Sequence, residues 1–154
     1  MDISVVTVAY GAGPSLGRLL DSLAGEADEV VVVDNGEGGE EIAEAGTREG
    51  VRVVSPGENL GFAAGSNLGA DEAGGDVLVF LNPDTVVAPG ALDSLRRTLE
   101  DRSIGIAMAR LLVTDDAVSV TTAWTPPTSL ARRLWISPVR VTVNQRSGIR
   151  WRWV

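Results

Sequence analysis

Hydrophobic residues in the first part of the chain gather in short runs that are apolar at nearly every position, and polar or glycine-rich segments separate these runs. Four such runs, at residues Ile3–Ala9, 29–33, Val51–Val54 and Val77–Leu81, are rich in valine and other strand-forming residues. Short runs of this composition predict strands that are buried on both faces, as in a parallel sheet. A further strand is predicted over residues 104–113.

The segments between these runs carry apolar residues at helical spacing. Leucines at positions 16, 19, 20 and 23 predict a helix over residues 14–24, with Pro14 in its first turn. Further helices are predicted over residues 40–49, over residues 62–73 and after Pro89-Gly90. Buried strands that alternate with helices predict an α/β fold with a mainly parallel, Rossmann-like sheet flanked by helices.

Composition divides the chain close to Asp116. The length of 154 residues, 44% of them hydrophobic, suits one domain with its own core. Up to Asp116 there are 21 acidic residues and seven arginines, a net charge of -14, whereas the remainder has six arginines and no acid. All four tryptophans also lie in the remainder, where the hydrophobic pattern weakens. We therefore expect a domain over residues 1–116 and an irregular, poorly ordered tail over residues 117–154.

Composition also limits the chemistry and suggests a location. Because the chain has no cysteine and no histidine, disulfides, thiolate zinc sites and histidine-based catalysis are excluded. No apolar run approaches the roughly 20 residues of a membrane span, and the chain opens into a strand pattern, so we expect a cytoplasmic protein. The acidic body argues against nucleic-acid binding, whereas the arginine and tryptophan tail favours peripheral contact with the inner face of a membrane.

Polar side chains follow the predicted strands at their carboxyl ends. Ligands of open α/β sheets bind beyond these ends, where the chain turns and helices present free N–H groups. Four separate segments should therefore deliver polar groups to one edge of the sheet. These groups belong, in strand order, to Tyr10, to Asp34 with Asn35, to Asn59, and to Asn82 with Asp84.

Three of these exits have a functional and a structural interpretation. Asp34 is placed to accept hydrogen bonds from a ribose or a base, or else it forms an ordinary Asp-Asn-Gly turn. In the functional interpretation of segment 59–67, small residues allow a ligand to approach the backbone, and Asn67 faces the cleft. In the structural interpretation, the segment is a tightly packed helix start with Phe62 in the core. Asp84 is suited to Mg²⁺ or Mn²⁺ bound with substrate phosphates, or it forms a turn.

Four segments together resemble the family 2 glycosyltransferases of the GT-A fold, especially their rhamnosyltransferase-like bacterial branch. They are VVTVAY at 5–10, VVVVDNG at 30–36, ENLGFAAGSNLG at 58–69 and FLNPDTVVAPGAL at 80–92. The segments occur in the family's order and cover residues 1 to about 116. The third and fourth segments are the specific ones.

The resemblance implies a nucleoside-diphosphate sugar donor, suggested by the branch to be rhamnosyl or galactofuranosyl, and a glycan or lipid-linked acceptor, as in cell wall polysaccharide biosynthesis. It implies that Asp84, the last acid of the family's D-x-D motif, holds Mg²⁺ or Mn²⁺, while Asn82 replaces the motif's first acid. The implied donor-binding residues are Thr7, Ala9, Tyr10, Asp34, Asn59, Gly61, Phe62, Asn67 and Asn82.

The resemblance also implies inverting transfer, in which a carboxylate deprotonates the acceptor hydroxyl. That base is expected well after the D-x-D position, yet no Asp or Glu follows Asp116. The segments 118–140 and 149–154 only loosely resemble the family. We therefore expect a truncated chain that holds the donor-binding part and has little or no transfer activity alone.

Two alternatives remain open at this point. A dinucleotide-binding oxidoreductase fits the glycine-rich segment 11–17 and an acid about 20 residues later, at Asp34. Against it, Pro14 removes one N–H from the phosphate-binding turn, and segments 59–67 and 82–84 have no role. The second alternative is a non-catalytic binding remnant whose tail contacts a membrane or a partner.

Overall fold

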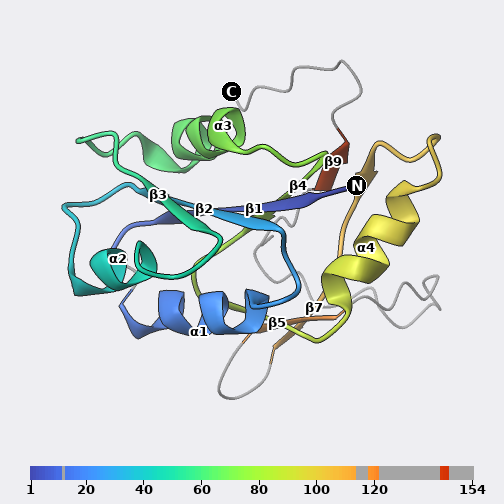
Figure 1. Cartoon of the computed structure of the whole chain (residues 1–154), viewed down its shortest axis with the longest axis horizontal. Helices are drawn as coiled ribbons and strands as arrows, with labels where there is room; N and C mark the ends of the chain where they lie inside the picture. The colour runs from blue at the N-terminus through green and yellow to red at the C-terminus, as the bar shows by residue number, and fades with distance from the viewer. Residues whose placement is uncertain (12, 114–117, 122–142, 146–154) are drawn as a thin grey trace.

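The computed structural model describes residues 1–11, 13–113, 118–121 and 143–145. Four helices and nine strands occur in these ranges, and Figure 1 shows their arrangement. In chain order they are β1 (Ile3–Ala9), α1 (Pro14–Leu23), β2 (Glu29–Asp34), α2 (Glu40–Ala45), β3 (Val51–Val54), α3 (Gly61–Glu72), β4 (Val77–Leu81), β5 (Thr85–Val87), α4 (Ala91–Leu99), β6 (Ile106–Ala107), β7 (Arg110–Val113), β8 (Val118–Thr121) and β9 (Val143–Gln145).

The main sheet has the strand order β3-β2-β1-β4-β9-β6. Its first four strands are parallel, with Val5 of β1 beside Val30 of β2 and Val79 of β4, and β9 runs antiparallel to both of its neighbours. A smaller sheet has the order β5-β8-β7. This architecture confirms the predicted α/β fold with a mainly parallel sheet flanked by helices.

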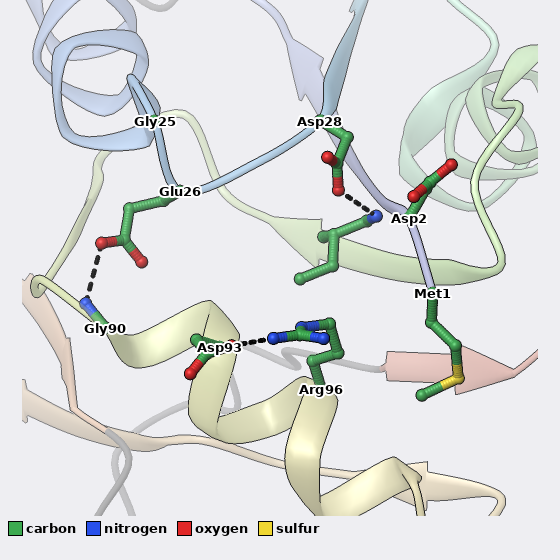
Figure 2. Close-up of a pocket in the computed structure, with 9 residues that line it drawn as sticks. Met1, Asp2, Gly25, Glu26, Asp28, Gly90, Asp93 and Arg96 are labelled. Atoms are coloured by element: carbon green, nitrogen blue, oxygen red, sulfur yellow. Dashed lines mark hydrogen bonds and ion pairs between the residues drawn. The ribbon is translucent and has the colours of Figure 1, made fainter.

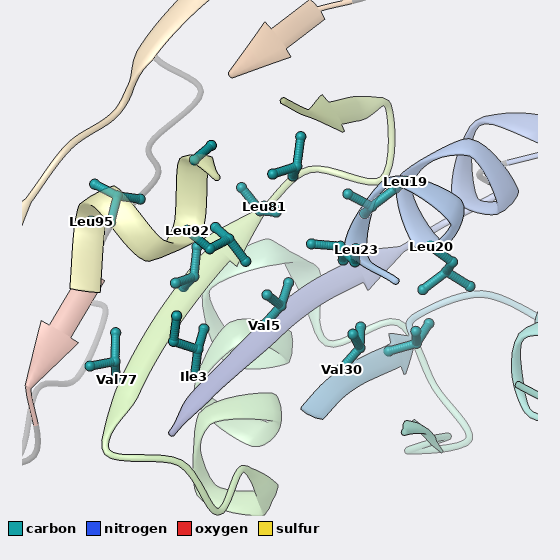
Figure 3. Close-up of a cluster of buried hydrophobic side chains, with 14 of the residues drawn as sticks. Ile3, Val5, Leu19, Leu20, Leu23, Val30, Val77, Leu81, Leu92 and Leu95 are labelled. Atoms are coloured by element: carbon teal, nitrogen blue, oxygen red, sulfur yellow. The ribbon is translucent and has the colours of Figure 1, made fainter. Parts of the chain in front are cut away.

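Alternate residues of the central strand supply two separate cores. Ile3 and Val5 of β1 pack against leucines of α1 and α4 on one face, as Figure 3 shows. Val6 and Val8 pack on the other face, which α3 covers. Every residue of β1 is buried because both faces of the sheet are covered by helices. The apolar runs of the sequence follow directly from this burial.

Helix α3 approaches the sheet closely because glycines face it. A Cβ at Gly65 would lie 3.0 Å from Val8 Cγ1, and a Cβ at Gly69 would overlap Val6 Cγ1. Larger residues at these two positions would push the helix away from the sheet. The small residues of the segment therefore have a packing role in addition to any role at a ligand.

Several predicted boundaries differ from the structure. The strand predicted over 104–113 is divided into β6 and β7, which lie in different sheets, and the helix predicted over 40–49 ends at Ala45. Strands β5, β8 and β9 were not predicted, because each is only three or four residues long and has at least one pairing partner far away in the chain. The predicted disorder of the tail concerns residues 117–154, most of which lie outside the described residues.

Candidate functional site

The strand registers place the exits of β1, β2 and β4 at the same edge of the sheet. Ala9, the last residue of β1, lies beside Asp34, and Thr7 lies beside Leu81, the last residue of β4. Since β2 and β4 flank β1, their exits are separated by two strand spacings, about 10 Å. The connections from β1 and from β3 leave in opposite directions along the sheet, so this edge includes a topological switch point.

The carboxylate of Asp34 is buried and supports its own loop. Its Oδ1 accepts hydrogen bonds from the backbone N–H groups of Gly36 (3.2 Å) and Gly38 (3.4 Å), and its Oδ2 accepts one from Ser55 Oγ (3.3 Å). The residue is 7% exposed. Asp34 therefore makes the turn that the sequence offered as its structural interpretation, and its contact with a base or ribose stays a prediction.

Asn35 joins three segments of the edge. Its backbone N–H donates to Ala9 O (2.8 Å), its Nδ2 donates to Asn59 Oδ1 (2.8 Å), and its Oδ1 accepts from the backbone N–H of Leu60 (2.8 Å). Asn35 is 3% exposed, so these bonds are shielded from water. The sequence placed Asn35 at a strand exit but gave no reason to expect this connecting role.

The segment that opens α3 presents its polar and aromatic side chains at this edge. Asn59 is exposed, and its Oδ1 also accepts from the backbone N–H of Gly61 (2.8 Å). Gly61 has a φ of 73°, a backbone conformation that side chains disfavour. Phe62 is 51% exposed, so its interpretation as a core residue is wrong. Asn67 is half-buried on α3.

The three predicted residues at the end of β1 and just after it have different surroundings. Thr7 and Ala9 are 0% and 1% exposed, so their side chains are buried, and their assignment to the nucleotide pocket stays a prediction. The Thr7 hydroxyl has no hydrogen-bond partner among the described residues. Tyr10 is 69% exposed, and a Cβ at Gly36 would lie 3.7 Å from the Tyr10 ring. Tyr10, which directly follows β1, is therefore the one of these three residues whose side chain is open to a ligand.

Asp84 places an exposed carboxylate just beyond β4. Asn82, which is half-buried, makes a turn in which its carbonyl oxygen accepts from the backbone N–H of Thr85 (3.1 Å). The exposed Asp84 carboxylate that follows has no hydrogen bond or ion pair within the described ranges. No group of three or more acidic side chains there could hold a metal ion alone. The residues fit a cation that shares its ligands with substrate phosphates, and they do not fit a cation held by protein alone.

A hollow of about 460 Å³ lies at the opposite, amino-terminal edge of the sheet (Figure 2). Two of its acids already bind backbone groups: Asp28 accepts from Ile3 N (2.7 Å), and Glu26 accepts from Gly90 N (2.8 Å). Asp93 pairs with Arg96, and this hydrogen bond lowers the pKa of the Asp93 carboxyl below its ordinary value. The hollow is therefore separate from the strand exits that the sequence identified.

Comparison with known proteins adds a family match. Residues 4–151 match the family model described as Glycosyl transferase family 2. The "Uncharacterized protein MT1568" of Mycobacterium tuberculosis is 34% identical over 121 residues, which are 75% of this chain and 38% of that protein. The chain thus spans less than half the length of this curated relative.

Two solved structures are similar in fold. S. aureus TarS in complex with UDP-GlcNAc has a TM-score of 0.65 at 22% identity, over 75% of this chain and 36% of that one. The mannosyltransferase PcManGT from Pyrobaculum calidifontis, in complex with GDP-Man and Mn²⁺, has a TM-score of 0.61 at 22% identity, over 70% and 35%. These neighbours have the GT-A fold, which the described residues share. Within the described ranges, no helix has the length and apolar character that a membrane crossing needs.

Proposed function

This chain belongs to glycosyl transferase family 2, and from that premise we propose that it binds a nucleoside-diphosphate sugar at the carboxyl edge of its parallel sheet. The family match favours a glycosyltransferase over the dinucleotide-binding oxidoreductase that the sequence left open. TarS and PcManGT, which share the fold, are described in complex with UDP-GlcNAc and with GDP-Man and Mn²⁺. Their ligands define the class of compound to test with this chain.

The observation that carries the proposal is the joining of three strand exits into one hydrogen-bonded unit. Asn35 connects the end of β1 to the segment that opens α3. Around this unit, Tyr10 and Phe62 offer exposed aromatic rings, and Asp84 offers an exposed carboxylate. Aromatic faces suit a nucleobase, and a free carboxylate suits the cation that accompanies a diphosphate.

We assign the metal position to Asp84 on the chemistry of its carboxylate. A Mg²⁺ or Mn²⁺ ion takes one or two carboxylates and completes its shell with phosphate oxygens and water. When bound there, the ion stabilises the negative charge of the departing diphosphate. Asn82 adds a neutral side chain, so the site has one negative protein ligand and should hold the ion weakly in the absence of donor.

The reaction type and the acceptor are further parts of the proposal. The proposed reaction is inverting transfer of a hexose or deoxyhexose to the hydroxyl of a glycan or lipid-linked acceptor. No Asp or Glu follows Asp116, and we assign no described residue as the base that deprotonates the acceptor. Donor binding is therefore the property to measure first, and residues 1–116 are proposed to carry it. Contact of residues 117–154 with a membrane surface is a separate proposal, to be tested by flotation with anionic liposomes.

Calorimetric titration of the whole chain tests the proposed donor site. UDP-, dTDP- and GDP-sugars should be compared with and without Mn²⁺, and at least one should bind more tightly with the metal. Asp84→Ala should abolish the metal-dependent part of the affinity, because the variant removes the only charged protein ligand assigned to the ion. Its unfolding temperature should not change, since Asp84 is exposed and unpaired among the described residues.

Asp71→Ala is a matched control, because Asp71 is an exposed acid in α3 that has no assigned role at the edge. The control should bind donor and metal as the parent chain does. Equal affinities with and without Mn²⁺ in both the parent and the Asp84→Ala chain would remove the metal assignment. Failure of every nucleotide sugar to bind the parent chain would contradict the proposed function itself.

A further inference from the structure

We infer that Asn35 is a positioning residue of the donor site, and that it acts by orienting the amide of Asn59. This inference rests on the proposed function. Asn35 is 3% exposed, so a donor molecule at the edge does not reach its side chain. Its effect on binding must therefore pass through the residues it holds, Asn59 and Leu60.

The hydrogen bonds fix which way the Asn59 amide points. Its Oδ1 receives two hydrogen bonds, one from Asn35 Nδ2 (2.8 Å) and one from the backbone N–H of Gly61 (2.8 Å). A backbone N–H can only donate, so the oxygen of Asn59, and not its nitrogen, must face Gly61. The NH₂ group of Asn59 is left over, and it has no partner among the described residues. An exposed NH₂ group is a donor suited to phosphate or hydroxyl oxygens.

Asn35 is chemically specific for this task. One side of its amide donates to Asn59, while the other side accepts from Leu60 N (2.8 Å). A carboxylate of the same shape keeps the acceptor for Leu60 but cannot donate, and it directs negative charge at the Asn59 oxygen. The amide of Asn59 then has to turn its nitrogen inward, which withdraws the donor from the ligand side and leaves Gly61 N without an acceptor.

The central sheet fixes the position of Asn35. Asn35 N donates to Ala9 O (2.8 Å), and Asn35 directly follows Asp34, the last residue of β2, which pairs in register with Ala9. The position of Asn35 is therefore set by two buried central strands. Through Asn35, the same strands set the segment that opens α3, although that segment is exposed and 24 residues away in sequence.

Asn35→Asp tests the inference in the full chain. Affinity for the nucleotide sugar that binds the parent chain best, measured with Mn²⁺, should fall about tenfold, the effect of one lost hydrogen bond to a charged phosphate oxygen. The amide of Gly61 should exchange with solvent faster, while the amide of Leu60 keeps its acceptor and its slow exchange. Faster exchange of Gly61 alone is a signature that a general loss of stability would not produce.

Ser4→Ala is the control for stability. Ser4 is buried in β1 at the opposite edge, where its hydroxyl makes two hydrogen bonds. This variant should lower the unfolding temperature and leave both the donor affinity and the Gly61 exchange unchanged. Asn59→Ala is a second test at an exposed position where folding is not at risk, and it should lose donor affinity at least as much as Asn35→Asp.

The outcomes separate this inference from the function on which it rests. If the parent chain binds none of the UDP-, dTDP- and GDP-sugars, the proposed function fails. If the parent chain binds and either Asn35→Asp or Asn59→Ala binds equally well, the function stands and the positioning role of Asn35 is overturned. If affinity falls in Asn35→Asp to the same extent as in Ser4→Ala, the effect is one of stability and the inference is also overturned.

Discussion

The two edges of the parallel sheet are built from the same strands but use their polar residues differently. At the amino-terminal edge, two acids accept hydrogen bonds from the protein itself: Asp28 from Ile3 N, and Glu29 from Ser4 Oγ and Gly74 N. At the carboxyl edge, polar groups also bind one another, but Tyr10 and Asp84 remain exposed. Because the side chains of Tyr10 and Asp84 take no part in the hydrogen bonds of the described residues, they remain available to a ligand.

The hollow at the amino-terminal edge shows the same difference. The hollow of about 460 Å³ lies at the amino-terminal edge, where Asp28 and Glu26 already accept hydrogen bonds from backbone N–H groups. The carboxyl edge has the switch point, the free carboxylate and the exposed rings. The following changes should affect the two edges differently, and they are ordered from the largest expected effect to the smallest.

Gly69→Ala should damage both edges at once, because α3 runs from one edge to the other. The added Cβ would overlap Val6 Cγ1 and lie 3.0 Å from Val33 Cγ2, both on strands of the central sheet. We expect a loss of about 3 kcal/mol in the free energy of unfolding, measured by urea denaturation. Gly105→Ala, where no atom lies within 4 Å of the new Cβ, is the control and should be nearly neutral. A neutral Gly69→Ala would contradict the close packing of α3.

Ser4→Ala should damage the amino-terminal edge alone. The buried hydroxyl donates to Glu29 Oε2 (2.7 Å) and accepts from Gly75 N (2.8 Å), so its removal leaves a buried N–H without an acceptor. The expected cost is about 1–3 kcal/mol of folding free energy, measured in the same way. Nucleotide-sugar affinity should be unchanged. A parallel loss of affinity would show that the two edges are not independent.

Asp93→Asn should have the smallest effect and a distinctive pH dependence. Hydrogen bonding to Arg96 lowers the pKa of the half-buried Asp93 carboxyl in the folded chain. The carboxylate therefore adds stability above its unfolded pKa of about 3.9, and this contribution is lost as the pH falls through the lower folded value. Unfolding temperatures of the parent and variant should differ slightly at pH 7 and converge on acidification below about pH 4. A difference that persists at low pH would mean that the ion pair is not its cause.

The sequence predicted the central strands well because burial on both faces leaves a strong local signal. The runs at Ile3–Ala9, Val51–Val54 and Val77–Leu81 match β1, β3 and β4 in their bounds. β2 extends one residue beyond its predicted end, to Asp34, because that residue still pairs with Ala9. By contrast, β5 has only three residues and pairs with β8, which lies far along the chain, so no local sequence pattern predicts this strand.

At the site, the sequence located the edge but did not distinguish the tasks of its residues. Because Tyr10, Asp34 and Asp84 follow predicted parallel strands, the sequence placed all three at the carboxyl edge of the sheet. The burial of Thr7 follows from its place in a run predicted to be buried on both faces, and which residues of that run contact a ligand stays a prediction. The link from Asn35 to Asn59 spans 24 residues and involves two side chains, so it appears only once the strands and α3 are placed.

Chemical-shift mapping tests the central claim most directly. The whole chain, labelled with ¹⁵N, should be titrated with the nucleotide sugar that binds it best in the presence of Mg²⁺, which avoids paramagnetic broadening. Our account predicts that the amide signals of Gly11, Gly36, Gly61 and Asp84 shift together, while those of Asp2, Glu26 and Gly90 at the opposite edge do not. Shifts confined to Asp2, Glu26 and Gly90 would place the ligand in the amino-terminal hollow and contradict the account.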